Sequence, residues 1–316
     1  MEIITHNYKF EDIKLYNINE IEILCDILGV SRGYFNYFNF KKEIGYDTYI
    51  NKKGRKIEKP TGRLKIMQRN IHNELSKINF PKWVVSCNKG VSYIDNAKLH
   101  KDSLYVITLD IKDFYSNCKS KDVHKFFIDY MNTSIEISNI IVRLICREDR
   151  LPTGAPSSQL VAYLSHLEMF EKIQKICRDN KLKLSLYVDD LTISSDRSID
   201  NKIINSIILE IKKYGFEINS KKRRYYGKSK SKKITGVIIN KNNELKVPNR
   251  LKKEVIDLFK ELKCINIDRN NSTYLYKVRK LRGKLNACRC IEPNIFKQIN
   301  IELLKIEDIL IKNRAR

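Results

Sequence analysis

The amino-acid sequence predicts an α+β protein with a ferredoxin-like central sheet. Three observations support this class: a nearly all-apolar stretch, a later stretch that alternates apolar and polar residues, and helix-like apolar spacing around them. The elements follow in the order strand (104–109), helix (159–177), hairpin (181–195), helix (199–214) and strand (216–219). This order favours a ferredoxin-like sheet over a doubly wound parallel sheet.

Each element has its own signal. The segment 104–109 is apolar at almost every position, as expected for a strand in the middle of a covered sheet. The segment 181–195 alternates through Leu184 and Leu186, which predicts a hairpin with 189–190 at its tip. Similar patterns predict the flanking elements: helices over 10–40, 62–78, 121–146 and from 248 onward, a hairpin over 49–60, a Pro/Gly-bearing loop over 151–158 and strands over 233–247.

Composition and charge narrow the class of function. The chain has 316 residues and a mass of 37.3 kDa, a length typical of about two domains. Its apolar fraction of 42% excludes disorder as the main state. Lys and Arg number 61 against 37 Asp and Glu, so the formal charge is +24. We expect a polyanionic partner, nucleic acid first and an anionic membrane surface second. A biased base composition of the gene would explain why Lys is more frequent than Arg. It would not explain why basic residues exceed acidic residues by so much.

The sequence also carries expectations about location. The first residues lack the basic segment and apolar stretch of an export signal, and no apolar run approaches the roughly 20 residues that span a bilayer. The eight cysteines contain no C-x-x-C pair, so we expect reduced thiols and no zinc site. We therefore expect a cytoplasmic protein with no membrane partner.

Two groups of acidic residues stand out. Asp110 follows the apolar strand, where a lone carboxylate is costly unless it is paired or bound to a metal. Asp189 and Asp190 adjoin each other at the hairpin tip, where neighbouring carboxylates repel. Aspartate alone also favours turns, but a tight hairpin usually has Gly or Asn beside it. Hard oxygen ligands favour Mg²⁺, and two Mg²⁺ ions are the arrangement used for in-line phosphoryl transfer.

Several further segments complete an ordered set of motifs. They are Arg55-x-Ile57-x-x-Pro60 with Leu64-Lys65 and Gln68, then 109–115, 151–158 (LPTGAPSS), 187–190 (YVDD) and 215–222 (GFEINSKK). In this order they resemble the motifs of the reverse transcriptases. Two more segments are similar to the retron type: 96–100 (NAKLH) matches an N-A-x-x-H signature, and 234–236 (ITG) stands where V-T-G is usual. The chain departs from the family pattern at Thr153, usually Gln, and at Val188, more often Ala.

The resemblance implies a right-hand polymerase with fingers, a ferredoxin-like palm and a helical thumb. We expect an N-terminal helical lobe and fingers at 1–103, a palm at 104–240 in which 117–150 is partly fingers, and a basic thumb at 241–316. It also implies RNA-directed DNA polymerase activity with two Mg²⁺ ions. The implied partners are a cognate structured noncoding RNA as template and primer, dNTPs, a DNA product and an effector protein encoded nearby.

The resemblance also assigns roles to individual residues. The catalytic residues would be Asp110, Asp189, Asp190 and Lys222, with metal bound at Asp110, Ile111, Asp189 and Asp190. The nucleotide-binding residues would be Arg55, Tyr115, Gly154, Ala155 and Pro156. In this scheme Arg55 clamps the triphosphate, Tyr115 excludes ribonucleotides and Lys222 protonates the departing pyrophosphate. Structural alternatives stay open for three residues. Lys222 could belong to a solvated basic run, and Tyr115 could be an ordinary core aromatic residue. Asp113 could cap the helix that follows it.

Basic tracts predict where nucleic acid binds. Residues 212–233 hold ten Lys or Arg and one acid, and 241–316 holds 19 basic and nine acidic residues. Such an aggregate predicts binding that weakens steeply with salt. The expected RNA-binding residues are Asn96, His100, Arg223, Arg224, Arg279, Arg282 and Lys284. For His100, a buried structural role is an equal alternative.

Three hypotheses compete. The first is a retron reverse transcriptase that extends a 2′-hydroxyl of its RNA, leaves a branched RNA–DNA product (msDNA) and takes part in antiphage defence. The second is another polymerase with the same palm, such as a bacterial enzyme of the abortive-infection or diversity-generating type, or one that makes RNA. The third is a non-catalytic RNA-binding scaffold, against which the intact acids argue, because a binder of polyanions has no need of clustered carboxylates.

Overall fold

The computed structural model describes residues 8–40, 45–52, 54–264 and 272–314. Contacts divide the chain into two compact units, one made of Met1–Ser92 and Leu104–Tyr225 and the other of Tyr93–Ser103 and Tyr226–Arg316. Residues 93–103 therefore group with the C-terminal part of the chain. The predicted domain boundaries at 103 and 240 stay predictions.

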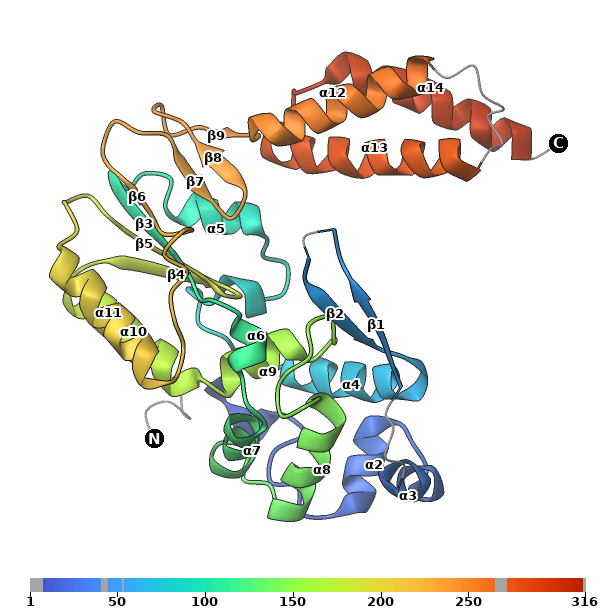
Figure 1. Ribbon diagram of the computed structural model, residues 1–316, viewed down its shortest axis with the longest axis vertical. Helices are drawn as coiled ribbons and strands as arrows, with labels where there is room; N and C mark the ends of the chain where they lie inside the picture. The colour runs from blue at the N-terminus through green and yellow to red at the C-terminus, as the bar shows by residue number, and fades with distance from the viewer. Residues whose placement is uncertain (1–7, 41–44, 53, 265–271, 315–316) are drawn as a thin grey trace. The chain divides into compact units, whose positions relative to one another are not determined.

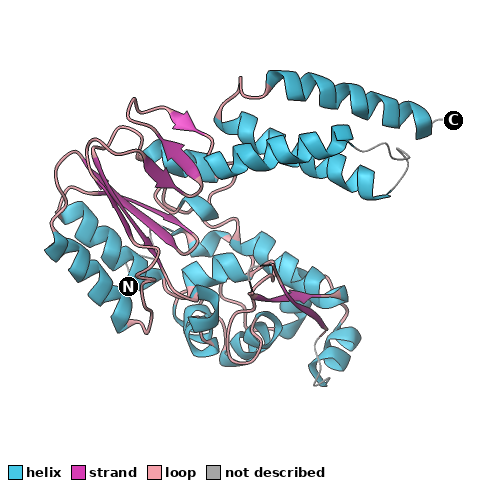
Figure 2. Ribbon diagram, turned by 45° about the horizontal axis from the view of Figure 1, so that its top comes forward, coloured by secondary structure: helices cyan, strands magenta, loops and turns pink. Residues whose placement is uncertain are grey.

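The first unit is built on a four-stranded sheet. Its strands are β3 (Tyr105–Asp110), β4 (Lys183–Tyr187), β5 (Asp190–Ser195) and β6 (Arg224–Tyr226), in the order β4-β5-β3-β6. Numbered along the chain, this is the order second, third, first, fourth, which is the predicted ferredoxin-like order. Helices α10 (Leu167–Asp179) and α11 (Asn201–Lys213) lie side by side along one face of this sheet (Figure 1 and Figure 2).

The fourth strand is β6, so the prediction of a strand at 216–219 was wrong. Ile218 forms a single bridge with Ile111. Two backbone bonds of 2.8 Å run from the N–H of Lys112 to the carbonyl of Glu217 and from the N–H of Asn219 to the carbonyl of Asp110. These bonds lie at and beyond the last residue of β3, so no ladder develops there. They fasten the segment beside Asp110 instead.

The first unit contains further elements besides this sheet. They are the 3-10 helices η1 (Phe10–Asp12) and η2 (Val85–Cys87), the hairpin of β1 (Tyr46–Ile50) and β2 (Lys56–Pro60), and helices α2 (Ile21–Leu28), α3 (Arg32–Phe40), α4 (Gly62–Leu75), α6 (Phe114–Asn117), α7 (Ser120–Asp129), α8 (Ile135–Ile145) and α9 (Ser158–Leu164). Two predicted helices are each divided. The helix predicted at 121–146 becomes α7 and α8, because Ser134 caps a new helix. The one at 159–177 becomes α9 and α10.

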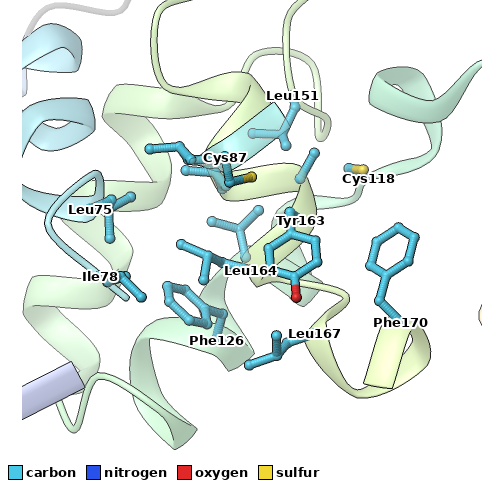
Figure 3. Packing of buried hydrophobic residues seen from close by; sticks show 14 of the residues in the cluster. Leu75, Ile78, Cys87, Cys118, Phe126, Leu151, Tyr163, Leu164, Leu167 and Phe170 are labelled. Atoms are coloured by element: carbon cyan, nitrogen blue, oxygen red, sulfur yellow. The ribbon is translucent and has the colours of Figure 1, made fainter. Parts of the chain in front are cut away.

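A shared apolar core holds these helices together. Leu75 of α4, Phe126 of α7, and Tyr163 and Phe170 of α9 and α10 are buried in it (Figure 3). The rings of Tyr163 and Phe170 stack with their centroids 5.4 Å apart. Buried aromatic side chains contribute large apolar areas to a core. This packing gives the loop before α9 a rigid base.

The second unit joins a small sheet to three long helices. Its elements are α5 (Tyr93–Leu99), the three-stranded sheet of β7 (Lys232–Ile234), β8 (Val237–Ile239) and β9 (Leu245–Lys246), and helices α12 (Asn249–Cys264), α13 (Ser272–Ile291) and α14 (Lys297–Arg314). Helix α5 was not predicted from the sequence. No helix in the described ranges is long and apolar enough to cross a membrane.

Candidate active site

Three acidic residues meet at one end of the β3–β5 pair. Asp110 is the last residue of β3 and lies directly opposite Asp190, the first residue of β5. Paired residues in a sheet point to the same face. The turn between β4 and β5 brings in Asp189, whose backbone carbonyl accepts a hydrogen bond of 2.9 Å from the N–H of Ile111. The predicted meeting of these residues is therefore present.

The turn that presents Asp189 is strained. Val188 has φ +61°, a left-handed conformation that β-branched residues seldom adopt. Its N–H donates to the hydroxyl oxygen of Ser86 at 2.9 Å, which holds the conformation in place. Backbone strain of this kind is concentrated at functional sites, because the surrounding structure must enforce it.

Burial and mutual repulsion disfavour the charged forms of these carboxylates. Burial, and next the nearby Asp110, raise the pKa of Asp189 above its ordinary value. Burial, then Asp189 and then Asp110 raise the pKa of Asp190. A cation bound between the carboxylates would offset both effects. The arrangement therefore favours binding of added positive charge.

Within the described part of the site, Lys222 forms an ion pair with one of these acids. Its Nζ donates to Oδ2 of Asp110 at 2.6 Å. The turn that carries it is fixed by the bond from the N–H of Lys222 to the carbonyl of Asn219, at 3.0 Å, and by the bond of Asn219 to Asp110. The structure thus places a predicted proton donor directly on a predicted metal ligand.

A cavity of about 460 Å³ opens in front of Asp110 and Asp189. Its lining includes the predicted residues Arg55, Tyr115 and Lys222. It also includes residues that the sequence analysis did not assign to the site: Lys56, Glu58, Lys112, Arg150, Thr153 and Asn219. The lining thus contains Arg and Lys side chains as well as the acids, a composition that suits a polyphosphate bound with metal ions.

The remaining predicted nucleotide-binding residues lie next to this cavity. Tyr115 is partly buried against the core, and this burial raises its pKa. Gly154 has φ +113°, and a Cβ there would lie 3.0 Å from Cγ2 of Ile57, so only glycine fits so close to β2. Within the described chain, Gly154, Ala155 and Pro156 adjoin the lining residue Thr153 without lining the cavity themselves.

Comparison with known proteins identifies the fold and the activity. Residues 41–239, well over half of the chain, match the family described as "Reverse transcriptase (RNA-dependent DNA polymerase)". This chain belongs to the reverse transcriptase family. Its fold is the right-hand polymerase fold that the motifs predict, and its activity is RNA-directed DNA polymerisation.

Several curated relatives of this reverse transcriptase are of the retron type. The retron Ec83 reverse transcriptase of Escherichia coli is 26% identical over 87% of this chain and 89% of that protein. The retron Se72 reverse transcriptase of Salmonella heidelberg is 31% identical over 69% of this chain and 60% of that protein. Among solved structures, the foamy viral protease-reverse transcriptase in complex with double-stranded DNA has a TM-score of 0.48 at 13% identity, over 85% of this chain and 39% of that one.

The donor set of this reverse transcriptase fits a divalent metal that arrives with substrate. In the described part of the chain, no three Asp, Glu, His or Cys side chains form a ready-made metal cluster. The oxygens of Asp110 and Asp189 nevertheless face one cavity, and the cation now on Asp110 is Lys222. Mg²⁺ is usually held by one or two carboxylates plus substrate phosphates rather than by an all-protein cage. Asp113, predicted to cap α6, makes no capping bond within the described residues.

The predicted RNA-binding residues fall into different environments. Asn96 and His100 are completely buried in the second unit, where the amide of Asn96 lies 3.4 Å from the hydroxyl of Thr235. This burial favours a structural role for the NAKLH and ITG segments over direct RNA contact. In the first unit, Arg224 is exposed, with Nη1 bonded to the carbonyl of Lys221 at 2.6 Å, and Arg223 is half-buried.

Two of the predicted thumb cations brace helices. Arg282 on α13 donates through Nε to Glu307 on α14 at 2.9 Å, and also bonds Asn300. Lys284 on α13 pairs with Glu254 on α12. Arg279, on the same helix, is exposed and forms no ion pair with another described residue. Of these three, Arg279 is the one free to meet RNA.

Proposed function

We propose that this reverse transcriptase copies a cognate structured noncoding RNA, which is both template and primer, into DNA that stays covalently joined to that RNA. The observation that carries this proposal is the meeting of Asp110 and Asp189 at the wall of a cavity that Arg and Lys side chains also line. The similarity to retron enzymes over most of the chain supports the retron-specific part. The product would be a branched RNA–DNA hybrid (msDNA), started from a 2′-hydroxyl of the RNA.

In this proposal Asp110 and Asp189 hold two Mg²⁺ ions, with Asp190 and Ile111 completing the site. When bound, the ions activate the attacking hydroxyl and stabilise the leaving oxygen. Arg55 binds the triphosphate of the incoming dNTP, since a guanidinium matches a phosphate fork. Tyr115 lies under the sugar and excludes a 2′-hydroxyl by steric contact. Gly154, Ala155 and Pro156 support the base and sugar as part of the loop beside the cavity.

Lys222 is proposed to give a proton to the departing pyrophosphate. It now bonds Asp110, so metal binding at Asp110 would release its ammonium group toward the cavity that it lines. Replacing Lys222 by Gln is expected to lower the rate of single-nucleotide incorporation by about 100-fold, the usual contribution of a general acid. Rapid-quench kinetics at saturating dNTP measure this rate.

The neighbouring Lys221 provides the matched control for Lys222. It is exposed and lies outside the cavity lining among the described residues. Lys221→Gln should therefore leave the incorporation rate within about twofold, because an exposed charge at this distance is screened. Equal losses in the two variants would assign the effect to the basic run as a whole and contradict the proton-donor role.

The exposed cations of α13 are proposed to contact the RNA. Replacing Arg279 by Gln should weaken RNA binding and reduce the slope of log affinity against log salt by about one unit, as expected for one lost phosphate contact. Arg282→Gln is the control, because Arg282 is held by Glu307 and Asn300. It should lower the melting temperature and leave the salt slope unchanged. The opposite pattern would assign the contact to Arg282.

Analysis of the nucleic acid that co-purifies with the full chain tests the proposed function. With dNTPs and Mg²⁺ added, we expect DNA whose 5′ end is joined to an internal nucleotide of one structured RNA, so that exhaustive ribonuclease digestion leaves a ribonucleotide on the DNA. DNA with a free 5′ end, made from any annealed primer, would favour another bacterial reverse transcriptase. RNA bound without any DNA synthesis would favour a non-catalytic scaffold.

We further propose that the product acts with an effector protein encoded nearby in antiphage defence. Similarity to retron enzymes is the only support for this role. Phage plating on cells that carry the locus with either wild-type enzyme or an Asp189→Asn variant tests it. Equal plating in both strains would exclude a defence role that depends on DNA synthesis.

A further inference from the structure

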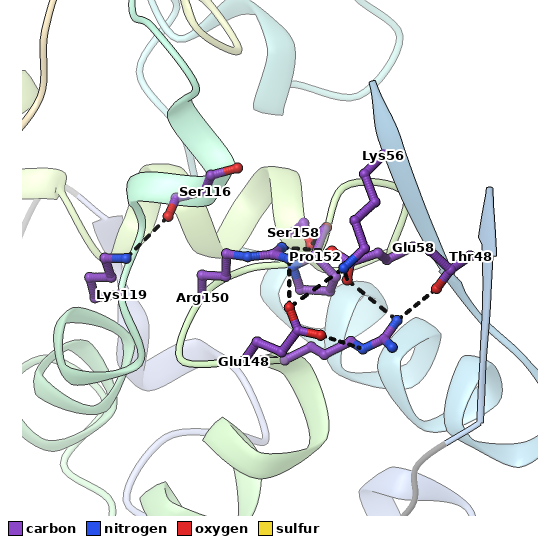
Figure 4. A network of polar contacts seen from close by, with 10 residues as sticks. Thr48, Lys56, Glu58, Ser116, Lys119, Glu148, Arg150, Pro152 and Ser158 are labelled. Carbon is purple, nitrogen blue, oxygen red and sulfur yellow. Dashed lines mark hydrogen bonds and ion pairs between the residues drawn. The ribbon is translucent and has the colours of Figure 1, made fainter. Parts of the chain in front are cut away.

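The cavity shares Lys56, Glu58 and Arg150 of its lining with a network of charged side chains that joins β2 to the turn over 147–150 (Figure 4). At the centre of this network is Glu58 of β2, which is 1% exposed. Nη1 of Arg150 donates to Oε2 of Glu58 at 2.6 Å. Nζ of Lys56 and Nη1 of Arg147 lie 3.2 Å and 3.3 Å from Oε1 of the same carboxylate. Glu148, which is about half exposed, pairs with Arg150 at 3.1 Å and with Lys56 at 3.6 Å.

The two arginines are brought together by an unfavourable turn. The N–H groups of Arg147 and Arg150 donate to each other's carbonyls at 2.8 Å and 3.1 Å, which closes a two-residue turn. Glu148 and Asp149 in that turn have φ +51° and +58°. Turns of this kind favour Asn-Gly, and like charges directly across a strand pair repel. This turn therefore has an unfavourable local sequence, and it places two guanidinium groups beside one carboxylate.

Glu58 also marks the place where β2 docks on the loop that follows Arg150. Its N–H donates to the carbonyl of Thr153 at 2.7 Å. The next residue, Gly154, approaches the backbone carbonyl of Glu58 so closely that an added Cβ would lie 3.4 Å from that oxygen. The carboxylate therefore sits at a rigid junction between the hairpin that carries Arg55 and the loop beside the cavity.

Only part of the hydrogen-bonding capacity of Arg150 is used by this network. A guanidinium has five N–H donors, and the bonds to Glu58 and Glu148 account for two of them. Arg150 lines the cavity together with Asp110 and Asp189. In the described part of the chain, Arg147 does not line it; its Nη1 bonds Thr48 of β1 at 2.9 Å and its guanidinium lies over the Tyr46 ring.

From this geometry we infer that Arg150 is a second polyphosphate-binding residue of the site and that Glu58 is the positioning residue that aims it. The ligand is the triphosphate of the incoming nucleotide, so the inference rests on the proposed role of the cavity as the nucleotide site. Both Arg55 and Arg150 line this cavity, so their two guanidinium groups would bind the same polyphosphate. Glu58 keeps the guanidinium of Arg150 from turning away into solvent.

Steady-state single-nucleotide incorporation at saturating primer–template tests this inference. Arg150→Gln should raise KM for dNTP about tenfold, a loss typical of one charged hydrogen-bonding partner, and leave kcat within about twofold. Inhibition by inorganic tripolyphosphate should weaken by the same factor. Arg147→Gln is the matched control, because it removes the other arginine from Glu58 on the side away from the cavity, and it should leave KM within about twofold.

Glu58→Gln tests the positioning role. It should raise KM as Arg150→Gln does, and the double variant should show no further rise, because both changes remove the same contact. Arg150→Lys keeps the charge without the fork, so it should give an intermediate KM and replaces the Gln variant if that variant does not fold.

The possible failures are separable. If the wild-type enzyme incorporates no dNTP, the proposed function itself has failed. If the wild type is active and Arg150→Gln or its Lys substitute keeps a normal KM, the inference is overturned. Equal KM increases in the Arg147 and Arg150 variants would also overturn it, because they would mark the network as purely structural.

Discussion

An Asp189→Asn variant is expected to lose DNA synthesis by at least about a thousandfold while keeping its affinity for RNA. The change preserves size and removes the charge that, with Asp110, would hold the metal ions, and ions that stabilise developing charge supply several kcal/mol of the barrier reduction. Burial and Asp110 raise the pKa of Asp189, so the charged form of this carboxyl is disfavoured and a bound metal ion would stabilise it. Primer extension on an RNA template and filter binding of the same RNA measure the two quantities.

Asp113 supplies a control with the same chemical change in the same cavity. It lines the cavity, is exposed and has φ +49°, a conformation that Asn tolerates well. Asp113→Asn should keep activity within about twofold. If Asp189→Asn retained activity, or if both variants lost it equally, the proposed division between metal-binding and other acids would be wrong.

Removing the charge of Glu58 is expected to cause the largest loss of stability among these variants. Glu58 is buried and pairs with Arg150, which is 17% exposed, and with the more exposed Lys56 and Arg147. Glu58→Gln therefore leaves Arg150, the most buried of these cations, without its partner. Breaking a buried pair in this way costs about 3 kcal/mol. The fluorescence of Trp83, the single tryptophan, reports unfolding of the unit that contains Glu58, and urea titration measures the free energy of unfolding.

Two comparisons check the cause of that loss. Glu148→Gln changes an acid of the same network that is 55% exposed, and it should cost less than about 1 kcal/mol. Burial alone would raise the pKa of Glu58, but the hydrogen bond from Arg150 and the ion pair with Lys56 outweigh it and hold the pKa below its ordinary value. The contribution of Glu58 is therefore present above a pH of about 4.3, the unfolded pKa, and is lost as pH falls through the folded pKa. A stability difference that stayed constant into acid would contradict this account.

The site could be predicted from sequence where local pattern and motif coincide. The apolar run before Asp110 and the alternation around 189–190 predict a strand and a hairpin, and the observed register places Asp110 opposite Asp190. The prediction of a strand at 216–219 was wrong because the backbones of Glu217 and Asn219 bond at and past the end of β3 rather than along it. The true fourth strand, β6, lies inside a basic tract whose composition gives no strand signal.

The network around Glu58 could not be predicted from sequence patterns, because it depends on contacts between distant segments. Glu58 and Arg150 are far apart in the chain, and their contact depends on the docking of β2 against the loop after Arg150. The available signals were the acid inside the Arg55-x-Ile57-x-x-Pro60 segment and the arginine immediately before the 151–158 loop. Likewise, the NAKLH segment was predicted to touch RNA from its motif alone, whereas the burial of Asn96 and His100 depends on the folded second unit.

The central claim is that carboxylates at the end of β3 and in the β4–β5 turn bind the divalent ions that drive nucleotide addition. A titration of Mg²⁺ into metal-free enzyme, with single-nucleotide incorporation on an RNA template as the readout, tests it most directly. The account predicts no incorporation without a divalent ion, a saturable rise with Mg²⁺ in the wild type, and background rates at every Mg²⁺ concentration in Asp110→Asn. Incorporation in the metal-free enzyme, or an Asp110→Asn curve that matches the wild type, would contradict it.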